Sequence, residues 1–212
     1  MAHHLTTIKQ AVVAGKHKQI EALVKAAIAD GEDLQSLISD GLISAMDVVG
    51  KKFGDGKIFV PEMLVSALTM KKALDLIKPL LKGDRSSSGR IVIGTVKGDM
   101  HDIGKNLVTM MLEGAGFQVT DLGVSITVQT VIDKVEELNP DVLCLSTLLT
   151  ITMPEMRRVI EELKARGLRD KVKVIVGGAP VDQRYADQIG ADGYGKDAVE
   201  AVALARRLVA ST

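Results

Sequence analysis

Along residues 90–212, short apolar runs rich in β-branched residues alternate with longer stretches of helical period. The runs expected as strands cover residues 91–96, 117–122, 141–147, 172–176 and about 192–194. Helices are expected near residues 104–115, 127–138, 154–166, 181–189 and 196–210. Five strand–helix repeats of this kind predict a parallel sheet with right-handed crossovers. The strand order that we expect is 2-1-3-4-5.

The chain before residue 84 has a helical period throughout. Apolar residues recur along one face in residues 5–13, 20–28, 34–49 and, after Pro61, 64–81. This pattern predicts about four helices joined by short loops, as in a small bundle.

Residues 84–89 are polar, small and aperiodic, which is typical of a linker. We therefore expect a helical domain at residues 1–83 and an α/β domain at residues 90–212. The predicted fold class is α plus α/β: a four-helix bundle, then a flavodoxin- or Rossmann-like domain with a five-stranded parallel sheet.

The composition limits the possible functions. Lysine plus arginine and aspartate plus glutamate number 27 each, so no basic field favours nucleic acid. The longest nearly apolar run, residues 142–153, is too short to span a bilayer, and the amino terminus lacks the regions of a signal peptide. We expect a cytoplasmic protein without membrane association. The single cysteine, Cys144, lies in an expected strand, which favours an inert core thiol.

Three short motifs follow three of the expected strands. They are Asp99-Met100-His101-Asp102-Ile103-Gly104, Ser146-Thr147-Leu148 and Gly177-Gly178. In the strand order 2-1-3-4-5 these strands are neighbours, so the motifs line one edge of the sheet, where such folds bind ligands. His101 can offer its imidazole to a metal, and Asp99 can accept the other ring N–H. Gly104 and the glycine pair allow the backbone to approach a bulky ligand closely.

Each motif also has an ordinary interpretation. A lone loop histidine is commonly solvated, and Gly-Gly after a strand is commonly a turn. The conjunction of all three favours a binding site. A phosphate-binding loop is the nearest alternative, because Gly98 to Asn106 imitates G-x-x-x-x-G-K-[ST]. We reject it, because the spacing is one residue too long and Asn106 replaces the hydroxyl that binds Mg²⁺.

Together, the motifs resemble the D-x-H-x-x-G, S-x-L and G-G signature of base-off cobalamin-binding domains. Residues 94–105 and 176–180 further resemble the corrinoid proteins of methanol, methylamine and methoxy-aromatic methyltransferase systems, which are related to the cobalamin-binding half of methionine synthase. The resemblance implies a carrier that is not catalytic alone and holds a methyl group on cobalamin or a related corrinoid. In such systems the cobalt alternates between the cob(I) and methylcob(III) states.

The resemblance also implies roles for individual residues. His101 would be the lower axial cobalt ligand, oriented by Asp99, and Thr152 would extend the pair into a hydroxyl relay. The alternative for Thr152 is an N-cap role before Pro154. The implied cofactor-binding residues are Gly98, Asp99, Met100, His101, Asp102, Ile103, Gly104, Ser146, Leu148, Thr150, Gly177 and Gly178.

Residues 53–61 resemble the segment that covers the methyl face of the corrin in methionine synthase. By this resemblance Phe53 and Val60 would lie over the methyl group. The alternative is a turn between two helices with Phe and Val in the core.

The implied partners are a substrate-specific methyltransferase, an acceptor methyltransferase that uses tetrahydrofolate or coenzyme M, and a reductive activase. Two other functions are less favoured. A cobalamin-binding sensor would carry a DNA-binding module, which is not evident here. The small subunit of a radical mutase would not need a methyl-shielding bundle. The residues do not identify the methyl donor.

Overall fold

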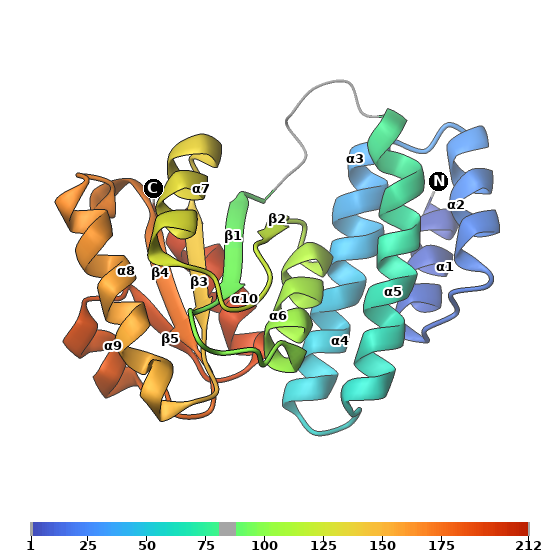
Figure 1. The fold of residues 1–212 in the computed structure, drawn as a ribbon. Coiled ribbons are helices and arrows are strands. Elements are labelled where there is room, and N and C mark those ends of the chain that lie inside the picture. Colours follow the sequence, from blue (N-terminus) through green and yellow to red (C-terminus); the bar gives the residue numbers. More distant parts are fainter. Residues whose placement is uncertain (1, 81–87, 212) are drawn as a thin grey trace. The chain divides into compact units, whose positions relative to one another are not determined.

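The computed structural model describes residues 2–80 and 88–211. The chain divides into two compact units (Figure 1). The first contains the residues before Ser88 together with Glu113–Gly116, and the second contains the remainder. Most of the expected linker, residues 84–87, lies outside the described residues.

The first unit is helical, as expected. Its long helices are α1 (Ala2–Val13), α2 (Ile20–Ala29), α4 (Ser44–Gly54) and α5 (Val60–Ile77). Short segments complete it: α3 (Leu34–Ser36), a π-helical turn η1 (Leu37–Ile43) that leads into α4, and a 3₁₀ turn η2 (Lys78–Leu80). Aliphatic and methionine side chains fill its core, among them Ile20, Leu37, Leu42, Met63 and Met70.

The π-helical turn is the feature of this unit that periodicity did not predict. The apolar pattern of residues 34–49 reads as one regular helix, whereas the middle of that stretch is wound more widely. Leu37, Ile38 and Leu42 remain buried through the turn. The wider winding therefore preserves the apolar face that the sequence shows.

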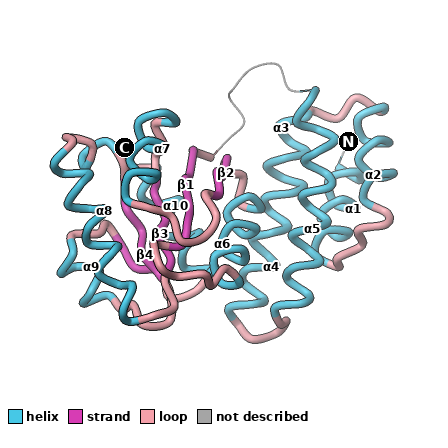
Figure 2. Tube along the Cα trace, viewed as in Figure 1, coloured by secondary structure: helices cyan, strands magenta, loops and turns pink. Residues whose placement is uncertain are grey.

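The second unit contains the predicted sheet (Figure 2). Its strands are β1 (Arg90–Thr95), β2 (Gln118–Asp121), β3 (Val142–Ser146), β4 (Lys173–Gly177) and β5 (Gly193–Gly195). All pairs are parallel and the order is β2-β1-β3-β4-β5, which confirms the expected topology.

Helices connect these strands near the expected positions. They are α6 (Ile103–Gly114), α7 (Val128–Leu138), α8 (Met153–Ala165), α9 (Gln183–Ile189) and α10 (Ala198–Val209), with 3₁₀ turns η3 (Thr150–Thr152) and η4 (Arg169–Lys171). Thr127, Asp182 and Asp197 each accept a backbone N–H as N-caps of α7, α9 and α10.

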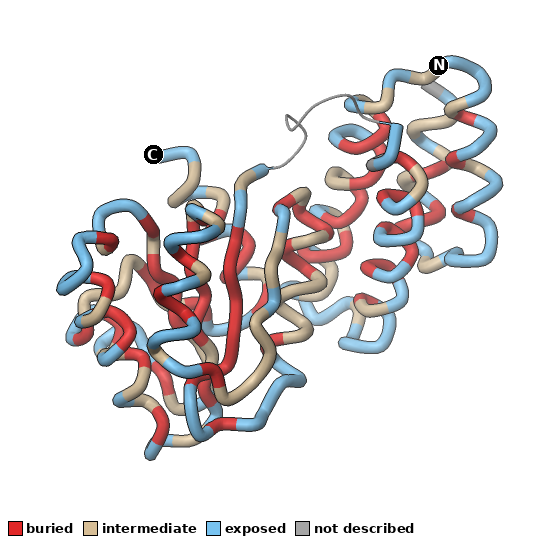
Figure 3. The backbone as a smooth tube through the Cα atoms, turned by 45° about the horizontal axis from the view of Figure 1, so that its top comes forward, coloured by how far each residue is buried: buried red, intermediate tan, exposed pale blue. Residues whose placement is uncertain are grey.

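Alternate residues of the strands point to opposite faces of the sheet. Val92, Leu143 and Val174 occupy one row and pack in a core with residues of α7 and α8. Cys144, one position on, is buried, and burial raises the pKa of its thiol to about 12. The expected place of Cys144 in the core is thus confirmed. Figure 3 shows the strands as largely buried.

In the described part of the chain, no helix has both the length and the apolar character needed to cross a bilayer.

Leu143 is fully buried at the centre of this core, so Leu143→Ala should leave a cavity. We expect it to lower the free energy of unfolding by about 2–5 kcal/mol. Urea denaturation followed by circular dichroism measures the change. The control is Glu161→Ala on the exposed face of α8, which should change stability by less than about 0.5 kcal/mol. Equal midpoints for the two variants would contradict the assignment of Leu143 to the core.

Candidate functional site

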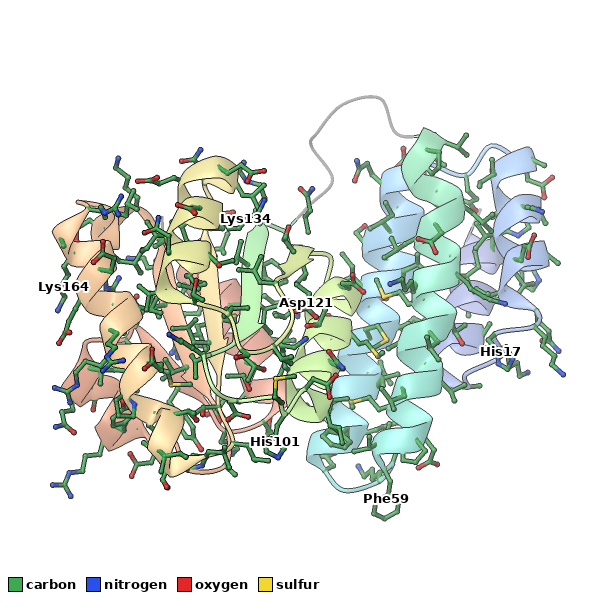
Figure 4. The ribbon with its side chains drawn as sticks, viewed as in Figure 1. His17, Phe59, His101, Asp121, Lys134 and Lys164 are labelled. Atoms are coloured by element: carbon green, nitrogen blue, oxygen red, sulfur yellow. The ribbon has the colours of Figure 1, made fainter. Side chains whose placement is uncertain are left out.

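The strand register brings the predicted motifs to one edge of the sheet. Thr95 at the end of β1 pairs with Ser146 at the end of β3, and Ser146 pairs with Gly177 at the end of β4. These residues therefore form one row at the carboxyl edge. The loop that carries His101 follows β1 directly, and Figure 4 labels His101 in it.

Asp99 and His101 form the centre of the site. The Oδ1 atom of Asp99 lies 2.7 Å from Nδ1 of the His101 ring and accepts the His101 backbone N–H at 3.0 Å. The carboxylate is completely buried, whereas the imidazole is about half exposed, at 53%. A carboxylate at Nδ1 favours the tautomer with its proton there, which leaves the lone pair on Nε2. Thr95 Oγ1 holds the same loop by donating to the His101 carbonyl at 3.0 Å.

The other carboxylate oxygen of Asp99 faces the loop after β3. Oδ2 accepts the backbone N–H of Leu148 at 2.6 Å, that of Leu149 at 3.2 Å and the hydroxyl of Thr147 at 2.9 Å. Burial by itself would raise the pKa of Asp99. The hydrogen bonds from the backbone of His101 and Leu148, from the His101 ring and from Thr147 outweigh it and lower the pKa well below its ordinary value. Asp99 is therefore a buried but stably charged carboxylate.

Thr152 lies beside this carboxylate, as the resemblance implied. Its Oγ1 is 3.3 Å from Asp99 Oδ2, 2.9 Å from the Leu149 carbonyl and 2.6 Å from Thr147 Oγ1. Thr152 occupies the N-cap position of α8, but its side chain makes no capping hydrogen bond. Thr152 therefore stands at the N-cap position of α8, as the alternative expects, but its hydroxyl does not cap the helix.

Thr147 is a site residue that sequence reasoning missed. It is 1% exposed and its hydroxyl lies between Asp99 and Thr152. The available signal was its position as the first residue after β3, next to Ser146, in a loop already assigned to the site.

The remaining predicted hydroxyl residues lie nearer the surface. Ser146 is partly buried at the end of β3, and Thr150 is exposed at the start of η3. Neither hydroxyl is hydrogen-bonded to another residue in residues 2–80 or 88–211, so both can bond a polar ligand group.

The predicted glycines have different roles in the structure. A Cβ on Gly104 would meet nothing within 4 Å, which leaves the open approach that we expected. At Gly177 and Gly178, by contrast, close contacts within the protein itself require glycine. A Cβ on Gly177 would lie 2.9 Å from the Gly195 carbonyl oxygen, and one on Gly178 only 1.7 Å from that of Thr147. Gly98 adopts a φ of +83° and donates its N–H to Ser125 Oγ at 3.0 Å.

Exposed apolar side chains lie on the two segments that meet at Asp99. Met100, Ile103, Leu148 and Ile151 all expose large apolar surface, up to 85% for Ile103. Ile151 was not predicted as a site residue. Asp102 lies on the same loop and is exposed. A single nitrogen donor within an apolar, open surface fits a large cofactor that supplies the other ligands of its own metal. Among the described residues, no cluster of three or more His, Cys, Asp or Glu side chains could hold a bare ion.

Lys105 further excludes a phosphate-binding loop. The lysine of such a loop points toward the phosphates. Lys105 is instead 3% exposed, is paired with Asp121 at the end of β2, and donates to Asn106 Oδ1 at 2.7 Å.

Known protein families match both units of this chain. Two families, each described as a B12 binding domain, match residues 89–203 and residues 5–78. The trimethylamine corrinoid protein of Methanosarcina barkeri is 43% identical over 198 residues, which cover 92% of this chain and 91% of that protein.

Two solved structures are similar over nearly the whole chain. A cobalamin-binding protein from Desulfitobacterium hafniense has a TM-score of 0.80 and 35% identity, covering 96% of this chain and 98% of its own. A chain of the methanol:cobalamin methyltransferase complex of Methanosarcina barkeri has a TM-score of 0.90 and 31% identity, covering 99% of this chain and 81% of its own. With its B12-binding domains and its relatives, this chain belongs to the corrinoid proteins of methyltransferase systems, and its cofactor is a cobalamin or related corrinoid.

Proposed function

We propose that this protein carries a methyl group on its corrinoid between two methyltransferases, with His101 as the lower axial ligand of a base-off cofactor. The observation that carries the proposal is the exposed His101 ring, held through Nδ1 by the buried Asp99 carboxylate. Only Nε2 then remains to bind cobalt. The corrinoid supplies the nucleophile and the methyl-bearing cobalt when it is bound.

In this proposal the protein residues bind the corrinoid, orient the His101 ring and shield the methyl group. Asp99 keeps the proton at Nδ1 of His101, which directs the lone pair of Nε2 outward. Met100, Ile103 and Leu148 provide exposed apolar surface at this edge. Gly98 and Asp102 shape the loop that carries His101, and Gly104 lies in the first turn of α6. We assign the cofactor's nucleotide tail to the edge formed by Ser146, Thr150 and the pair Gly177 and Gly178.

We further propose that the partners are a substrate-specific methyltransferase, an acceptor methyltransferase using tetrahydrofolate or coenzyme M, and a reductive activase. Two observations support a methyltransferase partner. One relative is named a trimethylamine corrinoid protein, and one similar structure is a methanol:cobalamin methyltransferase complex. The first name agrees with a methylamine donor and the second with methanol.

We assign Phe53 and Val60 to shielding the methyl group. Phe53 lies near the end of α4 and is partly buried, and Val60 is the first residue of α5 and 39% exposed. The B12-binding family that matches residues 5–78 supports a role of this region toward the cofactor.

His101→Ala tests the ligation. In the cob(II) protein, the EPR spectrum should show splitting from an imidazole nitrogen that changes when histidine is ¹⁵N-labelled. This splitting should disappear in His101→Ala, because the Nε2 ligand is gone. The control is His17→Ala, which removes an exposed histidine of the first unit and should leave the splitting intact. A His101→Ala spectrum identical to that of the unchanged protein would overturn the assignment.

Asp99→Asn tests the buried charge in the cofactor-free protein. The lowered pKa means that Asp99 stabilises the fold above the ordinary carboxyl pKa of about 4, and this contribution is lost as the pH falls below that value. We expect Asp99→Asn to lower the free energy of unfolding by about 2 kcal/mol at pH 7. Below pH 4 the difference from the unchanged protein should be smaller. Urea denaturation at several pH values measures it. Asp170→Asn, at an exposed position, should show neither effect. A pH-independent difference for Asp99→Asn would contradict the role of its charge.

Val60→Ala and Phe53→Ala test the shielding. With less bulk over the methyl group, methyl radicals should escape recombination, so the anaerobic photolysis rate of the methyl form should rise severalfold. Val65→Ala is a matched control, because Val65 lies on the same helix and is similarly exposed, at 37% against 39% for Val60. Equal photolysis rates for all three variants and the unchanged protein would refute the shielding role.

A further inference from the structure

Two hydroxyl groups lie near Asp99 Oδ2, and Thr147 is the nearer of the two. Thr147 and Thr152 have one hydroxyl proton each. Thr147 Oγ1 lies 2.6 Å from Thr152 Oγ1, a contact in which either hydroxyl can donate, and 2.9 Å from Asp99 Oδ2. A charged carboxylate is a stronger acceptor than a hydroxyl, which favours donation of the Thr147 proton to Asp99. Thr152 is 3.3 Å from Asp99, but only 2.6 Å from Thr147 Oγ1 and 2.9 Å from the Leu149 carbonyl. The Thr152 proton therefore goes to one of these nearer acceptors.

The backbone of Thr147 is held by the glycine pair. Its N–H donates to the Gly177 carbonyl at 3.2 Å, which continues the β3–β4 pairing by one residue. Its carbonyl oxygen occupies the space of a Cβ on Gly178, whose φ of +123° also favours glycine. The G-G motif thus lets the loop after β3 approach β4 closely enough to hold Thr147 in place. The backbone of Thr147 is thus fixed by contacts within the chain.

We propose that Thr147 is a positioning residue for His101, and that Thr152 acts on Asp99 through Thr147. The order of the chain of hydrogen bonds is then His101, Asp99, Thr147 and Thr152. This inference rests on the proposed ligation of cobalt by His101. It differs from the role that the resemblance implied for Thr152, in which that hydroxyl itself extends the His–Asp pair.

The expected effect follows from the partners that Asp99 would keep. Without the Thr147 hydroxyl, Oδ2 still accepts from Leu148 and Leu149, so the carboxylate stays charged but is less firmly held. Outer partners of a metal ligand commonly change metal affinity about 10–100-fold when they are lost. Because two backbone donors remain, we expect the low end of that range, about 10-fold in the equilibrium between histidine-bound and histidine-free cobalt.

The test compares Thr147→Val, Thr147→Ser, Thr152→Val and the double valine variant in the full chain loaded with cobalamin. EPR of the cob(II) form measures the histidine-bound fraction, and spectroelectrochemistry measures the cob(II)/cob(I) midpoint potential. Thr147→Val should lower the histidine-bound equilibrium constant about 10-fold and shift the potential to more positive values, because weaker axial ligation favours cob(I). In Thr147→Ser the histidine-bound equilibrium constant should remain within about twofold of that of the unchanged protein, since serine keeps the hydroxyl donor.

Non-additivity separates the two threonines. Thr152→Val alone should have a smaller effect than Thr147→Val, and the double variant should match Thr147→Val. The proposal is overturned if Thr152→Val has the larger effect, if the two effects add, or if Thr147→Val leaves both readouts unchanged. Thr147→Ala replaces Thr147→Val if circular dichroism shows that the valine variant is unfolded. If the unchanged protein itself lacks nitrogen splitting, the proposed ligation fails, which is a different result.

Discussion

The site depends on one buried charge. Asp99 has no exposed surface, and an isolated carboxylate in such a place would be very costly. Its charge is retained because the His101 loop donates to one oxygen, and the loop after β3 donates to the other. Two segments about 50 residues apart in sequence are thereby tied together at the sheet edge. The same carboxylate accepts hydrogen bonds from the loop after β3 and from the His101 ring, so the contact between the two segments also orients the ring.

The parallel sheet makes that arrangement possible. Parallel pairing places the ends of β1, β3 and β4 in one row, so each following loop starts from a fixed point at the same edge. The glycine pair then brings the loop after β3 against the end of β4, where no side chain would fit. Rigid strands and close backbone packing thus set the site in the cofactor-free chain. This agrees with a protein whose chemistry is supplied by its cofactor while the chain supplies position.

The surface around the histidine differs from an ordinary protein surface. Ile103 and Ile151 are more than four-fifths exposed, beside Met100 and Leu148, although a chain of this size can bury most of its large aliphatic residues. Exposed apolar residues that gather around one polar group commonly mark a binding surface. An open surface of this kind suits the cofactor of the family, because a corrinoid is broad and brings its own metal.

Much of this molecule could be predicted from local pattern alone. Strand–helix alternation predicts the topology, because βαβ connections allow few arrangements, and the strand order predicts which loops are neighbours at the carboxyl edge. Asp99 and His101 were found because they are two residues apart on one loop. Thr147, Ile151 and the reason for Gly178 were decided only by the tertiary structure. Their roles arise from contacts between loops that are distant in sequence, and a sequence pattern does not show which hydroxyl lies nearer a carboxylate or which carbonyl fills the place of a Cβ.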